Sequence, residues 1–325
     1  MPPPPPPGAA VPRRGDPKFG GARAPRYVPD PGRASAARAD AEAAAVPDTV
    51  LDGAAHGPFT VRAASVRGDS HRYFAEPRQD SLVVARLGDA EDPSGLLLLG
   101  VADGVGSAPR SHLGSALVCR ETVRLLDDYA EELSECLRTG DERSLNGLVN
   151  SVVGRIADAL VRAAEVAGHE PRAYATTLRV LLVPLDPAVR GRALLTVGDG
   201  GTALLREGTW HLDARFAPRT PDGGGAPPAA PAGDGVIDTG TAALPSTRHA
   251  EVDLFTTRPG DVLVLCTDGL SNPLGGDADI RVFLARAWGT GEPPPGLADF
   301  LWQLQYRVKS YDDDRTAVCL WEAGA

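Results

Sequence analysis

Two apolar segments of the chain end in the same polar pattern. Residues 96–102 form an apolar run that is followed by Asp103 and Gly104, and residues 262–266 form a second run that is followed by Thr267, Asp268 and Gly269. Such runs are typical of strands buried on both faces. Each strand therefore presents a carboxylate at its rim, where an oxygen ligand for a hard cation would be placed. We predict that Asp103 and Asp268, although far apart in the sequence, meet at one site.

The rest of the pattern predicts more strands than helices. Alternating or continuous apolar runs predict strands at residues 58–66, 82–85, 177–183, 193–197, 202–206, 251–255 and 316–321. Helical spacing of apolar residues predicts helices at 113–126, 145–167 and 297–308. Strands and helices do not alternate strictly, so we predict an α+β fold in which helices cover antiparallel sheets.

Low-complexity segments suggest the domain boundaries. Residues 1–55 are rich in Pro, Ala, Gly and Arg, and we expect a disordered tail there and one folded domain at 56–325. The run Pro2–Pro7 is interpreted as a solvated polyproline segment, with an SH3-type ligand as the alternative. Residues 217–235 are rich in Pro and Gly and predict a long loop, either a flap over a substrate or a loop without function.

Composition excludes several classes of partner. The formal net charge is −10, which argues against nucleic acid as a partner of the folded part. The apolar runs are too short to span a membrane, and the N-terminus lacks the apolar core of a secretion signal. The four cysteines are scattered without a C-x-x-C pair and are interpreted as buried free thiols. These features favour a cytoplasmic protein.

Acidic residues recur at strand ends and in the turns beside strands. They are Asp80, Asp103, Asp199, Asp268 and the triplet Asp312–Asp314. Each one alone is explained by a turn, but the combination suits Mg²⁺ or Mn²⁺, which prefer carboxylate, carbonyl and water oxygens. No two histidines have the spacing of a zinc site.

The chain resembles the metal-dependent Ser/Thr phosphatases of the 2C type, in particular a bacterial branch of that family. The resemblance covers roughly residues 57–322, and its motifs occur in the family's order. The matching segments are Gln79-Asp80, 101–106 (VADGVG), 175–178 (ATTL), 197–199 (VGD), 265–270 (LCTDGL) and 312–316 (DDDRT).

This resemblance implies a two-sheet antiparallel β-sandwich flanked by α-helices, with two Mn²⁺ or Mg²⁺ ions at one end. By position, Asp103 matches the bridging carboxylate and Gly104 the backbone carbonyl ligand. Asp268 and Asp313 match further ligands of the first ion. Asp80 matches a carboxylate that orients metal-bound water, and Asp199 a residue associated with a third, weaker ion.

The sequence departs from the family pattern at three positions. Gln79 stands where many members have a Glu that helps to bind the second ion, and Asp314 replaces the usual Asn. Ala75 occupies the usual position of the phosphate-binding Arg. His71, Arg72 or Arg78 are candidates for the missing cation, and Arg matches phosphate geometry best.

The leading hypothesis is a phosphatase that hydrolyses phosphoserine or phosphothreonine on proteins by direct attack of metal-bound hydroxide. His71 is a candidate general acid, with an ordinary structural role as the alternative. We expect a monomer whose substrates are products of a Ser/Thr kinase. A second hypothesis is a catalytically weak, phosphatase-like module that binds a phosphorylated partner. A third is a stress-response regulator whose substrate is a phosphorylated, anti-anti-sigma-like protein.

Overall fold

The structure is a computed structural model that describes residues 19–20, 26–27, 40–89, 95–212, 242–289 and 293–323. The polyproline run Pro2–Pro7, most of the expected tail and the expected loop at 217–235 lie outside these residues.

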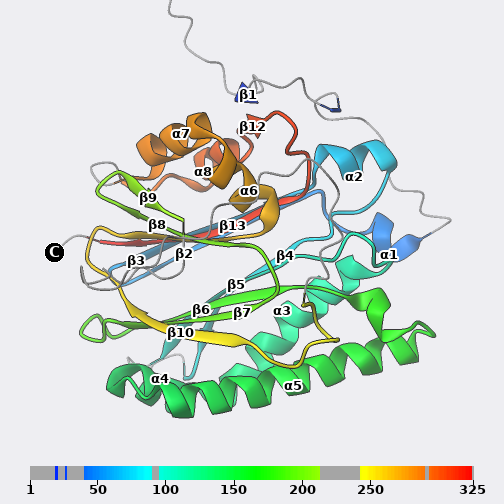
Figure 1. Cartoon of the computed structure of the whole chain (residues 1–325). Helices are drawn as coiled ribbons and strands as arrows, with labels where there is room; N and C mark the ends of the chain where they lie inside the picture. Colours follow the sequence, from blue (N-terminus) through cyan, green and yellow to red (C-terminus); the bar gives the residue numbers. More distant parts are fainter. Residues whose placement is uncertain are drawn as a thin grey trace, which may run out of the picture.

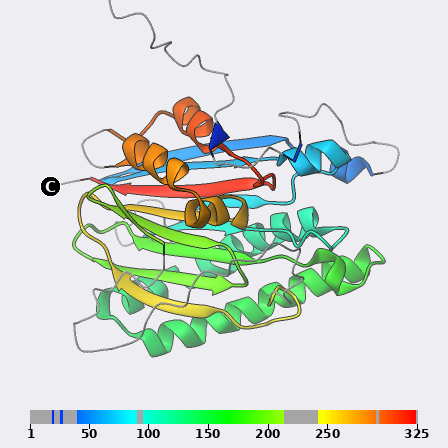
Figure 2. The same ribbon diagram turned by 45° about the horizontal axis from the view of Figure 1, so that its top comes forward.

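Two antiparallel sheets pack face to face, and each has helices on its outer face (Figures 1 and 2). The five-stranded sheet has the order β10 (Glu251–Thr256), β7 (Gly191–Val197), β6 (Leu178–Pro184), β5 (Leu96–Ala102) and β4 (Ser81–Leu87). Its outer face is covered by α3 (Ser111–Asp127), α4 (Ala130–Thr139) and α5 (Glu142–Val166).

The larger sheet has six strands. Their order is β2 (Thr49–His56), β3 (Phe59–Val66), β13 (Arg315–Glu322), β11 (Val262–Cys266), β8 (Gly201–Arg206) and β9 (Thr209–His211). On its outer side lie α6 (Asp268–Gly276), α7 (Ala278–Trp288) and α8 (Leu297–Leu304).

Five short elements complete the described structure. They are α1 (Ala41–Ala44), α2 (Asp69–Phe74), the 3₁₀ turn η1 (Pro171–Tyr174) and a two-stranded parallel ladder of β1 (Phe19–Gly20) with β12 (Arg307–Val308).

The surroundings of strand β5 explain the continuous apolar run at residues 96–102. Leu97, Leu99 and Val101 face the other sheet, in a core that also contains Leu263 and Leu265 of β11. The alternate residues, beginning with Leu96 and Leu98, pack against α3 and α5. Because both faces of the strand are covered, every residue is buried, as the pattern predicts. The predicted α+β fold with helix-covered antiparallel sheets is confirmed.

Several predicted boundaries need correction. The folded part was expected to begin at residue 56, but Thr49–His56 already pairs along its whole length with β3. No element was predicted near residue 70, where the chain forms the helix α2. The helix expected to reach residue 308 ends at Leu304, and Arg307 and Val308 pair with β1.

The cysteine prediction is confirmed, because Cys119, Cys136, Cys266 and Cys319 are all buried free thiols. None of the helices in the described ranges combines the length and apolar character that crossing a membrane requires.

Candidate metal centre and active site

The two apolar strands do bring their terminal carboxylates together. β5 ends at Ala102, next to Asp103. β11 ends at Cys266, after which Thr267 occupies the position before α6 and Asp268 begins its first turn. Burial, followed by the charges of Asp80 and Asp268, raises the pKa of Asp103 well above its usual value. Burial and the charge of Asp199 likewise raise the pKa of Asp268, although a side-chain hydrogen bond with Asp103 opposes the rise. The structure therefore brings the carboxylates of Asp103 and Asp268 together.

Asp313 joins the same cluster from the loop before β13. Crowding by protein atoms, then the charges of Asp268 and Asp314, raise the pKa of Asp313 to about 7. Its side chain nevertheless keeps 55% of its surface accessible.

The cluster fits divalent cations. Asp103, Asp268 and Asp313 offer oxygen donors only, and each has a raised pKa because surrounding protein atoms and neighbouring carboxylates disfavour its charged form. A bound divalent ion would remove that repulsion, and carboxylate oxygens suit Mg²⁺ or Mn²⁺. The donor set therefore supports the ligand roles that the resemblance implies.

Gly104 is required by close packing at this end of β5. A Cβ atom on Gly104 would lie 2.7 Å from the Ser111 Cβ and 2.9 Å from the Gln79 carbonyl oxygen. The backbone next to it is fixed, since the Asp103 carbonyl accepts a hydrogen bond from the Thr177 amide at 2.8 Å. This bond fixes the backbone up to Gly104, whose own carbonyl is the ligand that the resemblance implies.

Asp80 is held inside the protein behind the cluster. Its Oδ2 atom accepts hydrogen bonds from the Thr267 hydroxyl at 2.7 Å and from the Thr316 hydroxyl at 2.6 Å. Burial and the charge of Asp314 raise its pKa well above the usual value. The sequence analysis gave no role to Thr267 or Thr316. The sequence signal that could have identified them is their position, because Thr267 precedes Asp268 and Thr316 lies at the start of β13.

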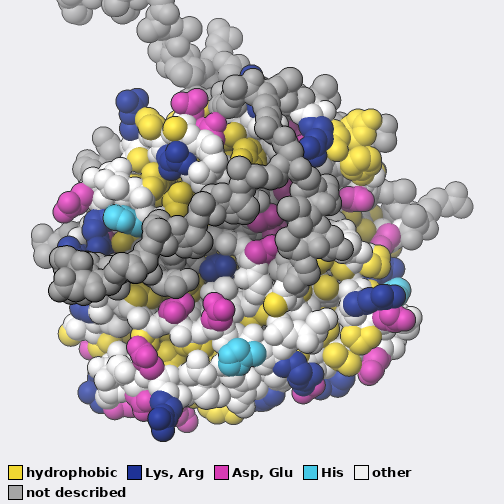
Figure 3. Space-filling model, in the orientation of Figure 1, with side chains coloured by type: hydrophobic (Ala, Val, Ile, Leu, Met, Phe, Trp, Pro, Cys, Tyr) yellow, Lys and Arg dark blue, Asp and Glu magenta, His cyan; other side chains and the backbone are white. Residues whose placement is uncertain are grey.

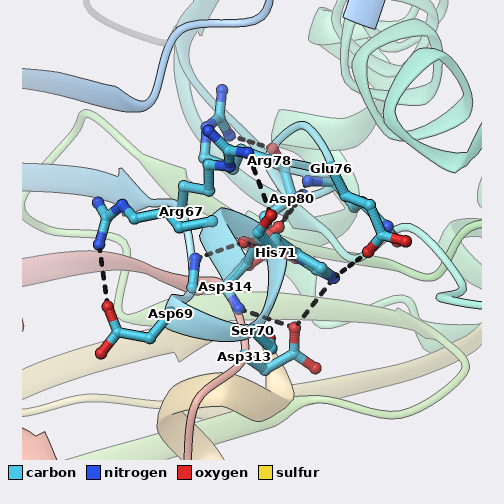
Figure 4. Close-up of polar contacts among 12 residues, drawn as sticks. Arg67, Asp69, Ser70, His71, Glu76, Arg78, Asp80, Asp313 and Asp314 are labelled. Atoms are coloured by element: carbon cyan, nitrogen blue, oxygen red, sulfur yellow. Dashed lines mark hydrogen bonds and ion pairs between the residues drawn. The ribbon is translucent and has the colours of Figure 1, made fainter. Parts of the chain in front are cut away.

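The aspartate triplet divides into a buried member and an accessible one. Asp314 points inward, where Oδ1 accepts from the Gly68 amide at 2.7 Å and from His71 Nδ1 at 2.8 Å. Its Oδ2 accepts from the Gln79 amide at 2.5 Å. Figure 4 shows Asp314 at the centre of this network and Asp313 at its edge. Asp313 is therefore the better placed candidate ligand.

His71 lies on α2 between three acidic groups. Its Nε2 atom is 3.8 Å from Asp313 Oδ1 and 3.9 Å from Glu76 Oε2, while Nδ1 contacts Asp314 (Figure 4). Burial alone would lower its pKa, but the hydrogen bond and charge of Asp314, with Asp313 and Glu76, raise the pKa to about 9. His71 is therefore a cation at neutral pH. Within the described residues, His71, Asp313 and Asp314 place ligand atoms within 4.8 Å of one another, which the ion pairs already explain.

Arg78 does not fit the predicted role of a phosphate-binding cation. The side chain is buried and donates through Nε to the Pro47 carbonyl at 3.1 Å and through Nη1 to Ser65 Oγ at 2.8 Å and to the Asp80 carbonyl. Through these bonds Arg78 joins β3 to the segment before β4. The prediction failed because spacing from the acidic motif does not show which way the side chain turns.

Gln79 and Asp199 differ in their exposure to solvent. The Gln79 side chain is buried and its Oε1 accepts a hydrogen bond from Ser111 Oγ at 3.0 Å. Asp199 is exposed in the turn between β7 and β8, close enough for its charge to raise the pKa of Asp268. It also lines a pocket of about 500 Å³ together with His249 and Glu251.

The chain matches one known protein family. The family description "Protein phosphatase 2C" matches residues 67–302, so the chain belongs to the protein phosphatase 2C family. No curated protein sequence matches the chain at a significant level.

Solved structures that share this fold include serine/threonine phosphatases. The catalytic domain of the serine/threonine phosphatase PstP, in complex with two manganese ions, is 21% identical over 84% of this chain and 98% of that chain, with a TM-score of 0.50. The Mycobacterium tuberculosis phosphatase PstP/Ppp is 20% identical over 82% and 99%, with the same TM-score of 0.50. PppA of Pseudomonas aeruginosa is 17% identical over 83% and 99%, also at 0.50. At these identities the likeness shows a shared fold.

Proposed function

We propose that the chain is a metal-dependent protein phosphatase that removes phosphate from phosphoserine or phosphothreonine. The observation that carries this proposal is the convergence of Asp103, Asp268 and Asp313, with Asp80 held behind them. Family membership agrees with it. We further propose that two Mn²⁺ or Mg²⁺ ions occupy the cluster, with Asp199 available to a third.

The chain's own residues would hold and orient the reactants. Asp103, Asp268, Asp313 and the Gly104 carbonyl are the proposed ligands. When bound, such ions polarise a phosphoryl oxygen and make water a better nucleophile. Asp80, fixed by two threonine hydroxyls, would orient the attacking water. The reaction forms a bond from phosphorus to the water oxygen, breaks the bond to the Ser or Thr oxygen, and forms no phosphoenzyme.

His71 is the proposed cation and proton donor of the site. It is protonated at neutral pH and its Nε2 faces Asp313. From there a proton on Nε2 would reach the departing Ser or Thr oxygen, which is too basic to leave as an anion. Asp314 holds the ring from the opposite side through Nδ1 and so fixes the direction of that proton.

A second candidate function is a phosphatase-like module that binds a phosphorylated partner with little turnover. It is favoured by Gln79, whose amide is bonded to Ser111, and by Arg78, which is engaged inside the fold. Because these two side chains are engaged inside the fold, fewer groups remain to bind a second ion or the phosphate. The intact set of Asp103, Asp268 and Asp313 favours the enzyme.

The remaining expectations stay proposals that follow from this function. The substrate would be a protein phosphorylated by a Ser/Thr kinase, and the protein would act as a monomer in the cytoplasm. A regulator that acts on a phosphorylated, anti-anti-sigma-like protein is one form of this proposal.

The test compares phosphate release from a phosphothreonine peptide and from a phosphotyrosine peptide of the same sequence, in Mn²⁺, Mg²⁺ or EDTA. We expect metal-dependent release that favours the phosphothreonine peptide. Binding of the phosphopeptide without release in either metal would support the binding module. Neither binding nor release, in a chain that remains folded, would contradict both candidate functions.

A further inference from the structure

An exposed aromatic surface lies beside the candidate active site. Tyr73 and Phe74 at the end of α2 keep 39% and 57% of their surface exposed. Figure 3 shows hydrophobic side chains gathered on the surface where α2 lies in Figure 1. Asp312 completes this surface, which we call the α2 rim and define as Tyr73, Phe74 and Asp312.

The α2 rim is already contacted by two residues of the N-terminal region. The Tyr27 ring lies 5.1 Å from the Tyr73 ring and 6.0 Å from the Phe74 ring, the latter edge to face. Its neighbour Arg26 places Nε 3.9 Å from Asp312 Oδ2. A basic residue followed by an aromatic one therefore matches the chemistry of this surface.

These contacts are loose enough to be displaced. The Arg26 side chain is 65% exposed, and an ion pair at 3.9 Å in such a position contributes little. Asp312 Oδ2 is buried and has no hydrogen-bond partner among the described residues, so a closer donor would improve its environment. Phe74 stays more than half exposed with Tyr27 in place.

The rim is directly connected to the catalytic cluster. Asp312 precedes the proposed ligand Asp313, and its carbonyl accepts hydrogen bonds from the Ser70 amide at 3.0 Å and the Ser70 hydroxyl at 2.8 Å. Ser70 in turn precedes His71. A segment bound on the rim would therefore enter the site next to the groups that act on the phosphate.

We propose that the α2 rim is a docking surface for a basic–aromatic segment of the phosphoprotein substrate, and that Arg26–Tyr27 occupies it in cis until the substrate displaces it. This inference rests on the proposed function for the identity of the partner. Phe19–Gly20 pairs with Arg307–Val308, so a second described part of the N-terminal region is attached to the folded domain, which keeps the competing residues close.

The first experiment measures binding and needs no catalysis. A synthetic peptide with the sequence of residues 22–31 is titrated in EDTA into the full chain and into its Arg26→Ala/Tyr27→Ala variant. In the native chain Arg26–Tyr27 occupies the α2 rim and lowers the fraction of molecules that can bind the peptide. We therefore expect the variant to bind the peptide about 5- to 10-fold more tightly than the native chain. A peptide in which the Arg-Tyr pair is replaced by Ala-Ala should not bind.

Adding Tyr73→Ala/Phe74→Ala to the double variant should abolish binding of the peptide. Thermal unfolding of this variant shows whether it is folded, and Val282→Ala, which removes an exposed apolar side chain from α7, is the matched control. Equal binding of the peptide to both forms of the chain, or binding that survives loss of Tyr73 and Phe74, would overturn the proposal.

A second experiment connects the surface to turnover. The Arg26→Ala/Tyr27→Ala variant should show a KM about 5- to 10-fold lower for a phosphothreonine peptide that carries Arg-Tyr, with no change for p-nitrophenyl phosphate. An equal change for both substrates would contradict docking. Because the binding experiment does not depend on activity, an inactive chain would refute the proposed function and leave the docking surface tested on its own.

Discussion

At the scale of single residues, the site depends on the different surroundings of two adjacent aspartates. Asp314 is buried and its two oxygens are used by backbone amides and His71. Asp313 is accessible, and the charge of Asp268 is close enough to raise its pKa. The triplet pattern by itself did not distinguish the three aspartates, and the family resemblance matched Asp313 to the ligand position. Only the contacts of Asp314 distinguish the structural residue from the proposed ligand.

The role of His71 is tested by the nature of the leaving group. His71→Ala should lower kcat for a phosphothreonine peptide about 100-fold, in the range expected for loss of a general acid. The loss should be far smaller for p-nitrophenyl phosphate, whose leaving group departs without a proton. Equal losses with both substrates, measured at saturating metal, would assign His71 a positioning role instead.

Gly269 is required because the backbone of the Asp314 loop passes close to α6. A Cβ atom there would lie 1.8 Å from the Asp314 carbonyl oxygen. Gly269→Ala should therefore lower the free energy of unfolding by about 3 kcal/mol through overpacking. The control is Gly147→Ala on α5, which meets nothing within 4 Å and should stabilise the protein by about 0.5–1 kcal/mol. Urea unfolding of both variants measures the difference, and equal effects would contradict the packing at Gly269.

At the scale of elements, a buried ion pair joins the two sheets. Arg192 of β7 is fully buried, with Nη2 3.3 Å from Glu322 Oε2 of β13, and its guanidinium lies 5.4 Å from the centre of the Phe59 ring. Thr257 donates to the same Glu322 oxygen at 2.7 Å, and Arg190 also pairs with Glu322.

Removing one partner of this pair should cost more than removing both. Arg192→Met leaves Glu322 buried with less compensation, and we expect a loss of about 3–5 kcal/mol in the free energy of unfolding. The double variant Arg192→Met/Glu322→Gln should recover part of that loss. Arg138→Met, which breaks the exposed pair with Glu135 on α4, is the control and should change stability very little. A fully additive double variant would show that the pair is not coupled.

The elements that the sequence predicted were those with strong local signals. β5 and β11 are continuous apolar runs, and α5 has long helical periodicity. β2 was missed because it is an edge strand, half exposed, with Asp52 and Gly53 in its middle. α2 is only six residues long, too short for a periodic pattern to appear.

The features of the site that the sequence predicted are also those with a local signal. The meeting of Asp103 and Asp268 followed from strand ends, which the sequence marks clearly. The orientation of Arg78 and the threonine support of Asp80 depend on contacts between distant segments, such as Thr316 with Asp80 at 2.6 Å. Tertiary contacts of that kind leave no periodic signal in one sequence.

At the scale of the whole molecule, the acidic cluster should make stability depend on pH and metal. The pKa of Asp313 is raised from 3.8 to about 7, and those of Asp103 and Asp268 are also raised. The folded, metal-free protein therefore binds more protons than the unfolded chain between about pH 4 and 7, and its stability falls as pH rises through this window. His71, with a pKa of about 9, adds stability that is lost as pH rises through 9.

Thermal unfolding in EDTA at pH 5 to 8 measures this effect. We expect the melting temperature to fall as pH rises, and Mn²⁺ to raise it most at the higher pH, because ionised carboxylates bind the ion. Asp313→Asn should make the dependence in EDTA weaker. A melting temperature that rises with pH in EDTA would contradict the clustering of these carboxylates.

The central claim is that Asp103 and Asp268 form one metal-dependent phosphatase site. The most direct measurement is kcat/KM for a phosphothreonine peptide in Mn²⁺, for the native chain, Asp103→Asn, Asp268→Asn and the exposed control Asp52→Asn. We predict losses of at least about 100-fold in the first two variants and an unchanged value in the control. Full activity in either Asp103→Asn or Asp268→Asn, with the same dependence on Mn²⁺, would contradict the claim.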